Sequence, residues 1–173
     1  MTVLSFLRVA VVALALWLGA AFGVAAEPLP QPTDSVILTV SGHIGQTNQD
    51  GTAVFDMAGF AGLGTETIRT GTIWTDGVTE FRGVSLKAFL DRLEAKGSIL
   101  RIWALNDYTV DVPFADAVAG GPILAFEADG KPLSVRDKGP IWLLYPFDSN
   151  PDYQTEVIYA RSIWQIERME VLE

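Results

Sequence analysis

The chain has 173 residues, of which 49% are hydrophobic and 19% are charged, and this composition fits one folded domain and excludes an intrinsically disordered chain. It has no Cys, which excludes disulfides, Cys-ligated zinc, iron–sulfur clusters and a thiolate bond to any metal. Because 12 basic residues stand against 21 acidic ones, the formal net charge is -9, and binding to nucleic acid is not expected.

Residues 1–26 have the pattern of a secretory signal peptide. Residues 9–26 carry no charged side chain and are almost wholly apolar, and the sequence Val-Ala-Ala that ends at Ala26 is one that a signal peptidase accepts. We therefore expect cleavage after Ala26, a periplasmic protein without a membrane span after cleavage, and a Pro-rich linker over residues 27–34. An uncleaved anchor is the alternative, since about 18 apolar residues approach the shortest length that spans a bilayer.

Residues 35–173 are predicted to form one α+β domain, with mixed or antiparallel sheets and few short helices. β-Branched residues indicate a strand over residues 35–40, and a bent strand or two strands joined at a bulge over the Thr-rich residues 65–75. Asp56 is expected to cap a short helix that runs through Phe60. The clearest helix is predicted over residues 85–95, where Ser85 is the expected cap and one apolar stripe is formed by Leu86, Phe89, Leu90 and Leu93.

The second half of the chain is predicted to contain mostly strands. The apolar run at residues 141–145 lies between two prolines, as expected of a strand that is buried on both faces. A polar loop is predicted over residues 146–155, and a helical or irregular piece near residues 157–162. The other predicted strands cover residues 99–105, 108–112, 123–127, 132–135 and 164–171, and Asp129-Gly130 forms the tight turn between the third and the fourth of these.

Common catalytic motifs are mostly absent. The single histidine, His43, lies at a probable strand end and is interpreted as a turn residue rather than a catalytic base. Asp148, Asn150 and Asp152 repeat the first ligand spacings of a calcium loop, but the later Gly and Glu are missing, which favours a solvated acidic loop over a weak cation site. These patterns predict no catalytic residue and no metal ligand.

The order of features from Ser35 onward resembles the molybdopterin-binding domain of the sulfite oxidase family, in its short secreted form. The resemblance is carried, in chain order, by residues 81–86, 104–108, Pro113, 123–126, 129–133, 139–146 and Trp164. It implies a sulfite-oxidase-like α+β fold that holds a pyranopterin in a cleft, with molybdenum bound by the pterin dithiolene and by one protein Cys.

The chain departs from this family where the resemblance places that Cys, since residues 65–75 offer Thr67, Thr70, Thr72 and Thr75 instead. A hydroxyl is a hard ligand and does not replace a soft thiolate. The prediction is therefore a periplasmic binding or accessory module without a redox role, with no cofactor predicted and molybdopterin allowed only by the resemblance. The alternatives are an oxidoreductase that holds molybdopterin through the dithiolene alone, and a purely structural partner in an envelope complex.

The candidate ligand-binding residues come from the matched segments and from the cations near them. A guanidinium suits an oxyanion, and Arg69 lies beside the place of the absent Cys, although an exposed ion pair with Glu66 or Glu80 explains it equally well. Trp142 and Trp164 are assigned to the core. The expected partner is a small anionic ligand or another periplasmic or envelope protein. The full candidate set is Arg69, Thr70, Trp74, Arg82, Asn106, Tyr108, Arg136 and Lys138.

Overall fold

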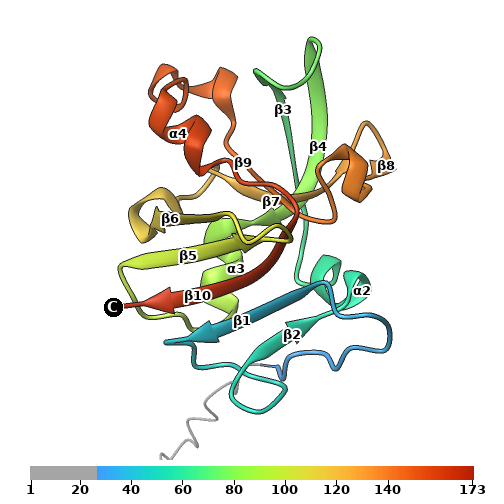
Figure 1. The fold of residues 1–173 in the computed structure, drawn as a ribbon, viewed down its shortest axis with the longest axis vertical. Coiled ribbons are helices and arrows are strands. Elements are labelled where there is room, and N and C mark those ends of the chain that lie inside the picture. The colour runs from blue at the N-terminus through green and yellow to red at the C-terminus, as the bar shows by residue number, and fades with distance from the viewer. Residues whose placement is uncertain (1–26) are drawn as a thin grey trace, which may run out of the picture.

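The computed structural model describes residues 27–173, so the predicted signal peptide lies outside the described residues. Two five-stranded sheets form the domain (Figure 1). In the first sheet, β1 pairs parallel with β10, and every other pair is antiparallel. Its strand order is β2 (Ala53–Phe55), β1 (Leu38–Gly42), β10 (Ile166–Leu172), β5 (Ile99–Ala104) and β6 (Thr109–Pro113).

The second sheet is antiparallel throughout and lies above the first in Figure 1. Its tallest part is the hairpin of β3 and β4, which rises beside helix α4. The mixed and antiparallel sheets with few helices confirm the predicted α+β class. The strands are β3 (Glu66–Gly71), β4 (Val78–Ser85), β7 (Ile123–Ala128) and β8 (Lys131–Pro132), and β9 (Trp142–Leu144) pairs with β7.

The helices are short, and the sequence explains where they begin. Asp56 caps α2 as predicted, because its Oδ1 accepts a hydrogen bond of 2.7 Å from the Gly59 N–H. Ser85 precedes α3 but its side chain forms no cap hydrogen bond, since the residue is also the last one of β4. The helices are α2 (Met57–Ala61), α3 (Leu86–Arg92) and α4 (Glu156–Arg161), with 3₁₀ turns η1 (Phe114–Asp116), η2 (Val135–Asp137), η3 (Phe147–Ser149) and η4 (Pro151–Tyr153).

Two strands were not predicted, and the predictions for residues 65–75, 85–95 and 132–135 were too long. β2 is only three residues long. In β4 the buried side alternates through Thr79, Phe81 and Gly83, and the strand continues to Ser85, directly before the predicted helix. In the Thr-rich stretch only residues 66–71 form a strand, and residues 72–77 turn the chain back into β4.

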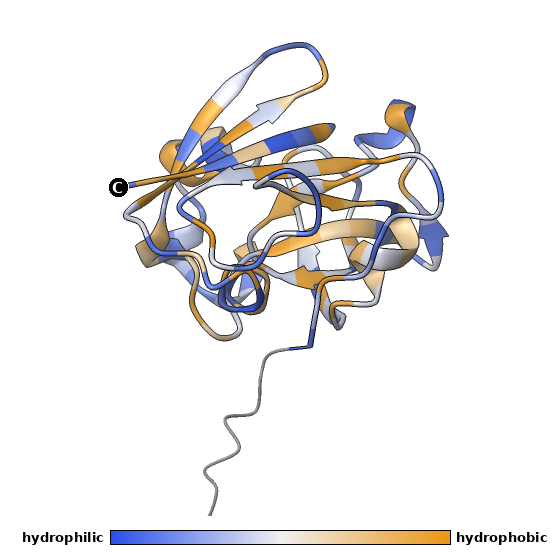
Figure 2. Ribbon diagram, turned by 90° about the horizontal axis from the view of Figure 1, so that it is seen from below, coloured by the Kyte–Doolittle hydropathy of each residue, from blue (hydrophilic) through white to orange (hydrophobic). Residues whose placement is uncertain are grey.

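The core fills the space between the sheets and the helices that cover them. The predicted stripe of α3 is buried, and residues 141–145 are at most 1% exposed, which confirms a strand buried on both faces. Figure 2 shows apolar strand segments joined by more hydrophilic turns. Within residues 27–173, no helix combines the length and apolar character needed to cross a membrane.

Residues 27–34 have no regular secondary structure, but they lie against the domain. Leu29 is only 5% exposed and belongs to the core. The Asp56 Oδ2 accepts hydrogen bonds from the Thr33 and Asp34 N–H groups at 2.7 and 3.1 Å. The backbone hydrogen bonds from Gly59, Thr33 and Asp34 lower the pKa of Asp56 below its ordinary value. One buried carboxylate therefore joins the Pro-rich segment to α2.

Candidate functional site

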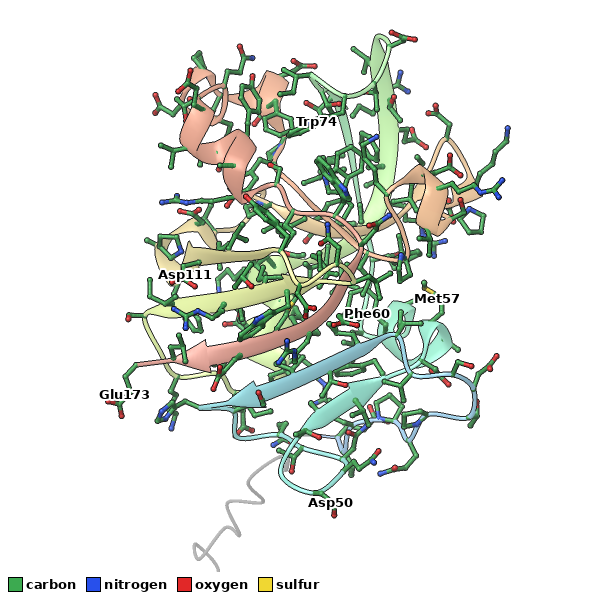
Figure 3. All side chains as sticks on the ribbon, viewed as in Figure 1. Asp50, Met57, Phe60, Trp74, Asp111 and Glu173 are labelled. Atoms are coloured by element: carbon green, nitrogen blue, oxygen red, sulfur yellow. The ribbon has the colours of Figure 1, made fainter. Side chains whose placement is uncertain are left out.

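An aromatic cluster fills the space between α4 and the β3–β4 hairpin. Trp74, in the turn between β3 and β4, lies in its centre (Figure 3). Its ring centroid is 5.7 Å from that of Trp142, 5.8 Å from that of Tyr159 and 5.7 Å from that of Trp164, and all three pairs are edge-to-face. The Trp142 indole is fully buried, and its Nε1–H donates to the Ser162 carbonyl oxygen at 3.1 Å. These contacts hold the rings in fixed positions.

A pocket of about 310 Å³ opens beside this cluster, and we call it the aromatic pocket. Three parts of the chain form it: the β3–β4 turn, the β5–β6 turn, and the stretch from α4 into β10. No charged side chain is among its lining residues. They are Trp74, Ala104, Asn106, Tyr108, Tyr159, Ala160, Ser162, Ile163 and Trp164.

The β5–β6 turn presents Asn106 and Tyr108 to the pocket. The Ala104 N–H donates to the Tyr108 carbonyl oxygen at 2.9 Å, and the Asp107 N–H donates to the Ala104 carbonyl oxygen at 2.9 Å. Asp107 has a φ of 64°, a conformation that Asp tolerates better than most residues, and the Asn106 Oδ1 accepts from the Tyr108 N–H at 3.2 Å. The turn is thus closed by its own hydrogen bonds, while the Tyr108 side chain remains exposed.

Helix α4 supplies Tyr159 and Ala160, and a partly buried network fixes it to the domain. The Asp116 Oδ2 accepts hydrogen bonds from the Arg161 Nη1 at 2.9 Å and from the Tyr145 hydroxyl at 2.7 Å. Burial, and then the hydrogen bond to Asp116, raise the pKa of Tyr145 well above its ordinary value, so the hydroxyl remains a donor. The wall of the pocket formed by α4 is therefore anchored through Arg161 to the Asp116 carboxylate.

The structure brings together four of the eight candidate residues. Trp74, Asn106 and Tyr108 line the aromatic pocket. Lys138 lies next to it, with its Nζ 5.3 Å from the ring centroid of Trp142 and 5.8 Å from that of Trp164. Lys138 also has a φ of 70°, a left-handed conformation that is uncommon for a residue other than Gly.

The other four candidates lie away from the aromatic pocket. Arg69 is exposed and pairs with Glu80 at 3.5 Å. Arg82 pairs with Glu127 at 3.4 Å, and Arg136 is exposed on η2. Thr70 is fully buried, on the opposite side of β3 from Arg69.

Sequence reasoning missed Tyr159 and assigned Trp164 to the core. Trp142 is a core residue as predicted, but Trp164 is only partly buried and lines the pocket. Both missed residues follow the polar loop, on the short helix α4 and just beyond it. Trp164 was interpreted as a packing residue, and Tyr159 was not considered as a site residue.

The residues in the Thr-rich stretch do not fit a protein-ligated molybdenum. The Thr70 Oγ1 accepts from the Asp148 N–H at 3.1 Å and donates to the Gly71 carbonyl oxygen at 3.1 Å. The Thr72 and Thr75 hydroxyls are hydrogen-bonded to each other at 2.8 Å. Thr67 is exposed on the outer side of β3. Hard oxygens that are already hydrogen-bonded, in a chain without Cys, supply no soft ligand.

Side chains outside the Thr-rich stretch also form no cluster of metal ligands among the residues that the structure describes. Among residues 27–173, no three His, Asp or Glu side chains come close enough together to hold a metal ion. In the incomplete calcium pattern, which begins at Asp148, the carboxylate of this residue accepts a hydrogen bond from the Gly71 N–H at 2.6 Å.

Comparisons with known proteins identify the class of protein to which this α+β fold belongs. Residues 56–148, which are 93 of the 173 residues, match the model of the oxidoreductase molybdopterin binding domain. The chain belongs to this family, which confirms the resemblance found in the sequence. No protein with curated annotation matches the sequence.

A solved structure supports the same fold. The chain is similar to the sulfane dehydrogenase SoxCD from Paracoccus pantotrophus, with a TM-score of 0.57 and 16% sequence identity. The similarity covers 78% of this chain and 37% of the SoxCD chain, so this protein spans little more than a third of that chain's length. At this identity the likeness shows the fold alone, and it confirms the predicted sulfite-oxidase-like fold.

Proposed function

We propose that this protein is a periplasmic binding module without a redox role, which keeps the molybdopterin-binding fold and holds its ligand in the aromatic pocket. The observation that carries the proposal is the pocket itself. It is open, has anchored aromatic walls, and contains Trp74, Asn106 and Tyr108 from the candidate set. Its volume of about 310 Å³ lies at the lower end of the range for small-molecule sites.

The donor chemistry of the Thr-rich stretch supports the absence of a redox role. A molybdenum centre in this fold needs a soft protein ligand according to the family resemblance, and Thr70 offers a hydroxyl whose hydrogen bonds are already made. Export to the periplasm is supported by the signal-peptide pattern of residues 1–26.

The charges around the pocket bear on the kind of ligand. Arg69 and Arg82 are each paired with a carboxylate and lie outside the pocket. An anionic ligand, or an acidic side chain of a partner protein, would therefore depend on Lys138 alone among the candidate cations beside the pocket. A ligand group that is uncharged or cationic suits the lining better, because no lining side chain carries a charge.

Metal analysis of the exported protein tests the proposal. The full chain is produced in a molybdenum-replete Gram-negative host, isolated from the periplasm, and examined by elemental mass spectrometry and ultraviolet–visible spectroscopy. We expect a colourless protein without stoichiometric molybdenum. Its intact mass should equal that of the chain from Glu27 to Glu173. Stoichiometric molybdenum with electron-transfer activity would instead support the alternative, an oxidoreductase that holds molybdopterin through the dithiolene alone. A chain retained in the membrane from Met1 would contradict export with cleavage.

A further inference from the structure

We propose that the aromatic pocket binds a quaternary ammonium group, an inference that rests on the binding function proposed above and names the ligand class. Aromatic ring faces are electron-rich and attract cations, and cages of several rings recognise methylated ammonium groups. The pocket has four aromatic side chains among its lining residues, and they come from three separate parts of the chain. They are Trp74, Tyr108, Tyr159 and Trp164.

The angles between the rings give the pocket corners rather than a flat platform. The Tyr159 ring stands at 89° to the Trp74 ring, and the Trp164 ring stands at 73° to it. A compact group placed in such a corner contacts more than one ring face at once, whereas a flat ligand would stack on only one. Tyr108, with 54% of its surface exposed, adds a wall on the solvent side.

Apart from Lys138, the charge of the protein favours a cation over an anion at this place. The lining has no charged side chain, and the chain as a whole carries a net charge of -9. Exposed carboxylates lie close in sequence to the lining residues, at Asp76 beyond Trp74 and at Asp107 in the β5–β6 turn. These carboxylates raise the local concentration of cations without contacting the ligand.

Hydrogen-bonding capacity distinguishes a quaternary ammonium from a primary one. A primary ammonium loses water from three N–H donors when it enters a pocket and needs acceptors in return. The Asn106 Oδ1 already accepts from the Tyr108 N–H, and the Ser162 hydroxyl, which donates to the Ile158 carbonyl oxygen, belongs to a residue that is only 1% exposed. A trimethylammonium group has no N–H donor, so the pocket can desolvate it at a lower cost.

Lys138 shows that the cluster accepts a cation and also provides the sharpest test. Its ammonium lies over the rings of Trp142 and Trp164, and Trp164 is shared with the pocket. A second cation in the pocket would be repelled by this charge, and an anion would be attracted by it. Removal of the Lys138 charge therefore has opposite effects on the two ligand classes.

Choline is the probe, titrated into the full exported chain and followed by tryptophan fluorescence and calorimetry. Its comparison ligands are the neutral carbon analogue, in which a tert-butyl group replaces the trimethylammonium group, and ethanolamine, which carries a primary ammonium. We expect choline to bind at least about fivefold more tightly than either, the ratio that corresponds to a cation–π gain of about 1 kcal/mol. Equal binding of the neutral analogue, or no binding of choline, would overturn the proposal.

Four variants separate the ligand contacts from the stability of the fold. Tyr108→Leu should weaken choline binding about threefold or more, whereas Tyr108→Phe should retain it because the ring face remains. Trp103→Leu is the matched control, because Trp103 lies on the opposite face of β5 from Ala104, which lines the pocket. The Arg168 Cζ lies over the Trp103 ring, 4.2 Å from its centroid. Lys138→Met should tighten choline binding about threefold at low salt, with a smaller effect at high salt.

The outcomes also separate this inference from the proposed function. Weaker choline binding in Lys138→Met, or equal losses in Tyr108→Leu and Trp103→Leu, would exclude the cation cage. A molybdenum-free protein that does not bind choline would remove only the ligand class proposed here. Stoichiometric molybdenum in the isolated protein would instead remove the proposed function, whatever the choline titration shows.

Discussion

Asp116 is the best place to test how the pocket is held in shape, because one carboxylate oxygen accepts from both Tyr145 and Arg161. The side chains of Asp116 and Arg161 are only 16% and 25% exposed, and Tyr145 is fully buried. Tyr145→Phe removes one hydrogen bond to a charged acceptor and should lower the free energy of unfolding by about 2 kcal/mol. Asp116→Ala leaves a buried hydroxyl and a guanidinium without their acceptor, so we expect a loss of about 3 to 4 kcal/mol.

The double variant measures how far the losses in free energy of unfolding at Asp116 and Tyr145 depend on each other. In Asp116→Ala/Tyr145→Phe the hydroxyl that lacks an acceptor is also gone, so the two losses should not add. The double variant should be more stable than the sum of the single variants predicts, by about 1 to 2 kcal/mol. Urea unfolding, followed by tryptophan fluorescence, measures the three differences, and an unchanged dependence on urea concentration shows that the unfolded state is the same.

Two results would refute this account of the network. Additive losses would mean that Tyr145 and Asp116 stabilise the domain independently. A neutral Tyr145→Phe would mean that the buried hydroxyl has no favourable bond to Asp116. Because α4 also carries Tyr159, Asp116→Ala should in addition weaken the binding of any ligand in the aromatic pocket, under conditions where the variant is still folded.

Three further changes have clear expected outcomes. Thr70→Val should lower the free energy of unfolding, measured by urea unfolding, by about 1 to 3 kcal/mol, because the Asp148 N–H loses its acceptor. Asp56→Asn should cost stability at neutral pH, and urea unfolding at several pH values should show the difference from wild type vanishing as the pH falls below about 3.9 and through the lower pKa of folded Asp56. Gly83→Ala should lower the melting temperature in calorimetry by roughly 5 °C or more, because its Cβ would lie 2.4 Å from the Leu124 carbonyl oxygen; a change within error would refute the close approach of β4 and β7.

The elements that the sequence predicted best have a periodicity that packing reinforces. The apolar stripe of α3 and the run at residues 141–145 are buried as expected. β4 was missed because its alternation passes through Thr79 and Gly83, small residues that carry little hydrophobic signal. Gly83 is buried there because another backbone approaches it closely, and that requirement comes from tertiary structure.

Three of the predicted residues line the aromatic pocket, and strand geometry explains why two others do not. Arg69 and Thr70 are neighbours in one strand, so their side chains point to opposite faces and no single cleft receives both. Trp74, Asn106 and Tyr108 meet because two turns far apart in sequence end at the same place. Tyr159 joins them through a tertiary contact that single-sequence periodicity does not encode.

Trp74 connects the segment without a metal ligand to the pocket. The Thr72 Oγ1 accepts a hydrogen bond of 3.0 Å from the Trp74 N–H, and it is bonded to the Thr75 hydroxyl on its other side. Hydroxyls in the stretch where the family resemblance places a thiolate thus shape the turn that holds an indole ring between four aromatic neighbours. In this chain the same stretch supports a ring face in place of a soft metal ligand, and the binding role proposed above therefore requires no change of fold.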